Sequence, residues 1–323
     1  MLAHQKIIAL LLFSASTAVI AATAPFDFSG KVSGGYDSNP AQTNVNQGFA
    51  FVHTDLDAAY HASDALTVGI NGWNRDFTAN NLMSRLTLYS DWAHDIAQGL
   101  GLLTVSLAAA AYRDRIVPAD ERDEMALMLR YDHILDARNN LSISGELRQL
   151  AYQQAALPWA GRPGSDPREH EMRERNPIKP LEIMQNGADA SGRTDWQTAT
   201  RLDLTHYWSP TRSSVLTVSI DRCASPIATE AFMRHNIGGV LRWEPRPKWS
   251  LEFNFDWSRL RYDAAPQQHE RIDLQRGLGI ELRRRIDLNS AWFCRSDWLN
   301  SDSTHPERGF QQQVNSCGVA WSF

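Results

Sequence analysis

The chain has 323 residues, of which 10% are aromatic, and a formal net charge of −5 at pH 7. This slightly acidic balance, without any basic stripe, argues against a nucleic-acid partner. Eleven residues are Trp, a side chain that collects at membrane–water interfaces because its amphipathic ring suits the headgroup level.

Residues 1–24 are predicted to be a signal peptide. Lys6 precedes an unbroken apolar run over 7–13, and small residues over 18–24 offer a cleavage site. The run is shorter than the roughly 20 apolar residues that a spanning helix needs, and charges interrupt every later apolar run. The rest of the chain, 25–323, is therefore either a soluble periplasmic protein or an outer-membrane barrel, and the patterning decides between them.

The pattern from Phe26 onward favours the barrel. About ten residues of alternating polarity, a turn, another ten residues and a loop repeat to the end of the chain, and a transmembrane strand needs about 9–11 residues. The clearest case is 249–257, where Trp, Leu, Phe, Phe and Trp alternate with Ser, Glu, Asn and Asp. Strands are predicted over 26–36, 48–60, 65–77, 82–92, 100–113, 123–133, 140–153, 195–208, 213–225, 230–244, 248–262, 271–285, 287–299 and 309–323.

The connectors support the same fold. Turn-like ones at 61–64, 93–98, 134–139, 209–212, 245–247 and 285–287 alternate with longer ones, apart from 78–81 and 226–229, which stay short. Bacterial barrels have short periplasmic turns and longer outer loops. We therefore predict an all-β, transmembrane, antiparallel up-and-down barrel of about fourteen strands. It would lie in outer-membrane lipids, be inserted by the barrel-assembly machinery, and keep both termini in the periplasm.

The loop 154–194 is the longest connector and contains five Pro residues. Structureless loops of this length are usually either functional or disordered. It either enters the lumen as a plug or constriction, or forms an outer partner-binding surface, or is a solvated mobile loop. The candidate gate residues are Arg168, Glu169, His170, Glu171, Arg173 and Arg175.

Charged residues of both signs share the polar parity of the predicted strands. They either form opposed rows that set up a porin-like transverse field, or pair off and close the pore. The candidate lumen residues are Arg75, Arg85, Asp91, Arg130, Glu146, Arg148, Arg201, Asp203, Glu252, Asp256, Glu281, Arg283 and Arg285.

Little in the sequence points to catalysis or metal binding. His53, Asp55 and Asp57 share one face of a strand and are the only acid/base candidates, but such residues more often join a mixed-charge lumen network. We predict no enzyme activity, no cofactor and no metal, since no Cys/His spacing matches a metal site. Cys294 and Cys317 share a parity on consecutive strands, so either they form a disulfide or all three Cys of the chain stay unpaired.

Two stretches resemble the barrel domain of surface lipoprotein assembly modifiers. One is Gly34-Gly35-Tyr36-Asp37-Ser38-Asn39-Pro40, and the other runs from Ser301-Asp302-Ser303-Thr304-His305-Pro306 to Asn315 and Phe323. The resemblance implies fourteen strands and a role in moving lipoproteins or secreted proteins across the outer membrane. Similar starts and endings occur in barrels tied to exopolysaccharide export.

Three functions follow from these observations. The leading one is a translocation channel whose lumen charges hold a lipoprotein or secreted-protein client. The second is a passive porin or polysaccharide-export pore whose lumen charges select solutes. The third is a barrel enzyme.

Overall fold

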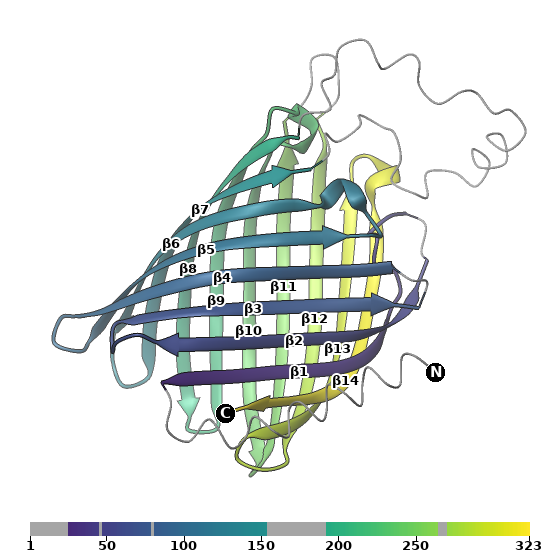
Figure 1. The fold of residues 1–323 in the computed structure, drawn as a ribbon. Helices are drawn as coiled ribbons and strands as arrows, with labels where there is room; N and C mark the ends of the chain where they lie inside the picture. Colours follow the sequence, from purple (N-terminus) through teal and green to yellow (C-terminus); the bar gives the residue numbers. More distant parts are fainter. Residues whose placement is uncertain (1–24, 45–46, 79–80, 154–191, 264–269) are drawn as a thin grey trace, which may run out of the picture.

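The computed structural model describes residues 25–44, 47–78, 81–153, 192–263 and 270–323. Fourteen antiparallel strands form one closed barrel, as predicted, in which each strand pairs with the next and β1 pairs with β14 (Figure 1). Among the described residues, no helix is long and apolar enough to cross a membrane. The strands are β1 Phe26–Asp37, β2 Phe49–His61, β3 Leu66–Phe77, β4 Asn81–Ile96, β5 Gly101–Asp114, β6 Arg122–Ile134, β7 Asn139–Tyr152, β8 Thr194–Ser209, β9 Arg212–Ala224, β10 Phe232–Arg246, β11 Trp249–Tyr262, β12 Ile272–Arg285, β13 Ser290–Ser303 and β14 Phe310–Ser322.

Single 3-10 turns lie in three of the connectors at one end of the barrel, η1 Pro118–Asp120, η2 Ala228–Glu230 and η3 Pro306–Arg308. We call this the loop end. The opposite end carries the tight turns, and we call it the short-turn end. The start of β1 at Phe26 and the end of β14 at Ser322 also lie there (Figure 1).

Two predicted strands have a boundary that differs from the structure by three or four residues, and the other boundaries differ by two residues at most. Strand β4 reaches Ile96 instead of residue 92, because Ala97, Gln98 and Gly99 all have positive φ and reverse the chain within a few residues. Strand β13 covers 290–303 instead of 287–299. Here the carboxylate of Asp287 accepts hydrogen bonds from the backbone N–H groups two and three residues on, a turn that competes with strand pairing.

A similar turn joins β6 to β7. The side-chain amide of Asn139 and the backbone N–H of Arg138 both donate to the Asp136 carboxylate at 2.7 Å. These bonds, that of Asn139 foremost, hold the pKa of Asp136 below its usual value. The turn therefore keeps its charged acceptor into mildly acidic solution.

The two faces of the strands differ in polarity. Large apolar side chains at alternate positions are exposed, among them Leu88 (57%), Leu129 (52%) and Leu278 (61%). Positions of the other parity carry most of the Arg, Asp and Glu residues of the strands. Since neighbouring positions of a strand face opposite sides of the sheet, the apolar set forms the outer wall and the charged set lines the lumen. An outer wall of this kind suits lipid rather than water.

The seam between β1 and β14 is held by residues of the motif that follows β1. The side chain of Asn39 donates to the carbonyl of Gln311 at 3.0 Å, and its backbone N–H donates to Asp37 at 3.0 Å. The amide of Gln312 also donates to Asp37, at 2.9 Å. Asp37 and Asn39 are fully buried, so the residues that carry the family resemblance close the barrel.

A disulfide joins the last two strands. Cys294 of β13 is the direct cross-strand partner of Cys317 of β14, with their Cα atoms 4.1 Å apart. Both have the parity of exposed apolar neighbours, Trp298 on β13 and Val319 on β14, so the bond lies on the outer wall. Cys223 is a buried free thiol.

We expect the Cys294→Ser/Cys317→Ser variant to fold but to lose roughly 2 kcal/mol of unfolding free energy. The bond closes a segment with a sequence separation of 23 residues and so restricts the unfolded chain. Urea unfolding in lipid vesicles would measure the loss, with Cys223→Ala as the control. A midpoint that responds equally to reductant in the wild type and in the double variant would contradict the assignment.

Candidate functional site

An Arg and a carboxylate two residues apart recur on the inner face of the barrel. Positions i and i+2 of a strand face the same side, so the two groups meet without help from another strand. Nη2 of Arg130 lies 2.7 Å from Asp132, and Nε of Arg201 lies 2.9 Å from Asp203. The other pairs of this kind are Arg122–Glu124, Glu146–Arg148, Arg193–Asp195, Arg271–Asp273, Glu281–Arg283 and Arg295–Asp297.

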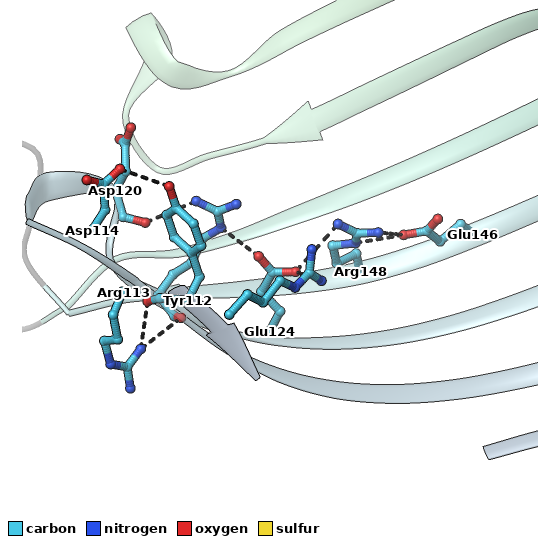
Figure 2. Close-up of polar contacts among 9 residues, drawn as sticks. Tyr112, Arg113, Asp114, Asp120, Glu124, Glu146 and Arg148 are labelled. Carbon is cyan, nitrogen blue, oxygen red and sulfur yellow. Dashed lines mark hydrogen bonds and ion pairs between the residues drawn. The ribbon is translucent and has the colours of Figure 1, made fainter. Parts of the chain in front are cut away.

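Glu124 is among the most buried of these groups, with a side chain that is 2% exposed. One of its oxygens lies 2.7 Å from Arg85 on β4 and 3.5 Å from Arg148 on β7, while the other lies 2.9 Å from Arg122. Arg148 continues the chain of contacts to Glu146 (Figure 2). A single carboxylate thus joins three arginines from three strands.

Aromatic rings pack between these charges. The guanidinium of Arg122 lies 4.7 Å from the Tyr112 ring, and the Tyr112 hydroxyl donates to Asp114 at 2.8 Å (Figure 2). Further round, Arg75 stacks on Phe51 at 4.6 Å. The barrel wall is therefore tightly packed at this level.

The ion pairs nearest the loop ends of the strands form a ring around the lumen. We call this ring the collar. It consists of Asp37, Arg75, Arg85, Arg122, Glu124, Arg148, Arg193, Asp195, Asp221, Arg234, Arg271 and Asp273.

The short-turn end of the lumen is different, because several of its charged side chains make no ion pair among the described residues. A cavity of about 630 Å³ opens there, with Asp55 and Asp57 of β2 on one wall. Lys248 and Arg285 line the wall formed by β10–β12, which Figure 1 shows behind β1–β4. We call it the turn-end cavity.

Hydrogen bonds to neutral groups fix the acidic wall. The amide of Asn71 donates to Asp55 at 3.1 Å, and the Tyr89 hydroxyl donates to Asp57 at 3.2 Å. Within the described ranges, neither carboxylate has a Lys or Arg nitrogen within 4 Å. Lys31, Lys248 and Arg285 likewise have no carboxylate within that distance. Asp55 and Asp57 therefore share one cavity with Lys248 and Arg285 without an ion pair between them, and Lys31, Glu244 and Arg283 complete its charged lining.

The structure separates the predicted lumen residues into three groups. Arg75, Arg85 and Arg148 belong to the collar. Asp91, Asp256 and Arg285 make no ion pair among the described residues. The remaining residues form ion pairs on the short-turn side of the collar, and they are Arg130, Glu146, Arg201, Asp203, Glu252, Glu281 and Arg283. The predicted gate residues 168–175 lie outside the described residues.

The acid/base candidates lie in two different surroundings. His53 lies next to Trp73, with ring centroids 6.0 Å apart, and its Nδ1 has no hydrogen-bond partner in the described part of the chain. Asp55 and Asp57 instead line the turn-end cavity. No group of three or more His, Cys, Asp and Glu among the described residues is placed to hold a metal.

Several residues of the site escaped the sequence analysis. Glu124 and Asp37 stand at strand ends, where alternation is weakest, and Lys31 stands alone among Gly and Ser. The Arg-x-Asp spacing on one strand face was the available signal for the paired groups, but it does not show which of them are buried.

No protein-family model matches the chain, and no curated protein matches it in sequence. Among solved structures the chain is similar to a loop-deleted form of the outer membrane protein OmpT of Vibrio cholerae, with 8% identity and a TM-score of 0.49 over 92% of this chain and 99% of that one. It is similar to an anion-selective porin from Comamonas acidovorans, with 8% identity and a TM-score of 0.47 over 93% and 99%.

A third similar structure is a bacterial polysaccharide outer membrane secretin, with 9% identity and a TM-score of 0.45 over 92% of this chain and 97% of that one. At these identities and TM-scores the likenesses identify no family. None of the three is a surface lipoprotein assembly modifier, so that resemblance stays a prediction.

Proposed function

We propose that the protein is an outer-membrane channel through which small charged solutes diffuse. The loop end would face the outside, and the short turns and both chain termini would face the periplasm. The observation that supports this best is the turn-end cavity, where Asp55 and Asp57 face Lys248 and Arg285 without ion pairing. Such opposed charges orient and select ions that pass between them.

Diffusion is a better proposal than translocation of a lipoprotein or secreted protein. A fourteen-strand barrel has a modest lumen, and the collar adds packed aromatic and charged side chains to its wall. The motif residues that suggested an export family, Asp37 and Asn39, are engaged in closing the seam. A polysaccharide chain remains the alternative cargo, since hydroxyl groups of Ser29, Ser250 and Ser322 also line the turn-end cavity.

Single-channel conductance in a planar bilayer tests the proposal. We expect steady, ohmic conductance from the refolded full chain, with a reversal potential that shows ion selectivity in a salt gradient. A variant lacking residues 158–192 should conduct as well, with selectivity of the same sign.

Two results would count against diffusion. Silence of both proteins would overturn the channel proposal. Conductance only after the deletion would overturn free diffusion and favour export of a protein or polysaccharide client through a closed barrel.

A further inference from the structure

Four basic side chains lie on the outer wall of neighbouring strands. They are Arg222 of β9, His235 of β10, Arg259 of β11 and Arg276 of β12. Each stands two residues from an exposed apolar side chain of the outer wall, namely Ile220, Ile237, Trp257 and Leu278. Since residues two apart in a strand face the same side of the sheet, each basic side chain points outward like its apolar neighbour.

The four side chains lie at nearly one height. Barrel strands are tilted, and a row of direct cross-strand partners that begins at Ser29, near the start of β1, reaches Asp195 at the loop end of β8. A row of direct cross-strand partners therefore moves toward the loop end from each strand to the next. Residues at equal height on successive strands are consequently not direct partners, because on each later strand they lie closer to the short-turn end than the direct partner does.

The cluster shows these steps. His235 is two residues from Met233, the direct partner of Arg222, and Arg259 lies directly opposite His235. Arg276 is two residues from Leu274, the direct partner of Arg259. Together with Arg261, the three arginines form what we call the outer arginine cluster, which lies at the loop-end border of the apolar wall.

An apolar groove lies directly below this cluster. It is a cavity of about 750 Å³ over β8–β13, lined by Leu216, Leu241, Phe253, Phe255, Leu278 and Trp298 among others. The ring of Phe255 packs over Gly239, where a Cβ atom would collide with it. Leu278 in the groove and Arg276 in the cluster are consecutive outward residues of β12.

The charges of the cluster can reach a ligand. Arg222 pairs with Asp263 at 2.6 Å and Arg276 with Asp302 at 3.6 Å, but their side chains are 44% and 59% exposed, and such surface pairs are weak. Among the described residues, Arg259 has no carboxylate within 4 Å.

An arginine binds phosphate through paired hydrogen bonds. The neighbouring carboxylates suit divalent cations, which bind oxygen ligands from carboxylates and phosphates together.

We propose that the groove and the outer arginine cluster bind one acylated glycolipid that carries two phosphates, of the lipid A type. An acyl chain fills the groove, one phosphate contacts Arg259 and Arg276, and a divalent cation bridges the second phosphate to Asp302. The inference rests on the proposed orientation, with the loop end in the outer leaflet, but not on any solute path through the lumen.

Native mass spectrometry of the full chain in detergent tests this. The probe is bisphosphorylated lipid A with Mg²⁺, compared with dioleoylphosphatidylcholine and with phosphatidylglycerol. We expect one lipid A to stay bound, and its binding to weaken about tenfold or more in the Arg259→Gln/Arg276→Gln variant, which loses two charge-assisted contacts. Leu278→Asn, which places an amide in the groove, should weaken it several-fold.

Arg113→Gln is the matched control, because Arg113 lies on the outward parity of β5, away from the groove, and pairs with Asp123. Heat-modifiable migration in gels confirms that each variant is folded. Equal lipid A binding by the double variant and the control would overturn the site. Binding of phosphatidylglycerol as tight as that of lipid A would overturn its assignment to a lipid with two phosphates.

Discussion

Replacing Glu124 by Gln should lower the free energy of unfolding by about 3 kcal/mol, because it leaves three arginines at the collar without their shared anion. The side chain of Glu124 is 2% exposed, while those of Arg85 and Arg148 are 30% and 28% exposed. Partial access of water to the arginines places the expected loss at the lower end for a broken buried ion pair. Urea unfolding in lipid vesicles measures it.

Glu252→Gln provides the matched control. Glu252 pairs with Arg242 at 2.9 Å, but the arginine side chain is 61% exposed. Surface pairs of this kind contribute less than about 1 kcal/mol. If the two substitutions cost the same, burial of Glu124 does not set its contribution, and the collar is not a stabilising ring.

Neutralising one wall of the turn-end cavity should reverse or strongly shift the ion selectivity of the channel. We expect Asp55→Asn/Asp57→Asn to shift the permeability ratio toward anions and Lys248→Gln/Arg285→Gln to shift it toward cations, each on the order of tenfold. A unit charge a few ångströms from a passing ion contributes about 1 kcal/mol in water. Reversal potentials in a salt gradient give the ratio directly.

Arg130→Gln/Asp132→Asn is the control for this experiment. It removes two lumen charges that already pair at 2.7 Å, so the net charge of the wall is unchanged. Its selectivity should stay close to that of the wild type. Shifts of similar size in all three double variants would show that the turn-end cavity does not determine selectivity.

The strand number and the lumen parity were predictable from the sequence because alternation repeats in every strand. Residues 249–257 illustrate this, since their aromatic and apolar side chains all lie on one face. The ends of β4 and β13 were not predictable to the residue. Their turns depend on local competition, such as the acceptor role of Asp287, that alternation does not report.

The division of the lumen into a paired and an unpaired region was not predictable. Arg285 and Arg148 look alike in sequence, yet Arg148 reaches Glu124 across a strand pair, whereas Arg285 reaches no carboxylate among the described residues. Which charges meet depends on register and tilt, and these follow from the closure of the whole ring. Sequence spacing alone fixes only the pairs two residues apart.

Those same-strand pairs have a consequence for how such a barrel can change over time. A strand with Arg201 beside Asp203, or Arg295 beside Asp297, brings its own counter-charge. A hairpin built from such strands can be duplicated or lost without leaving an orphan charge in its neighbours. Strands that carry their own counter-charge can therefore be gained or lost as units. The strands around Glu124 cannot, because its carboxylate pairs with arginines of three strands.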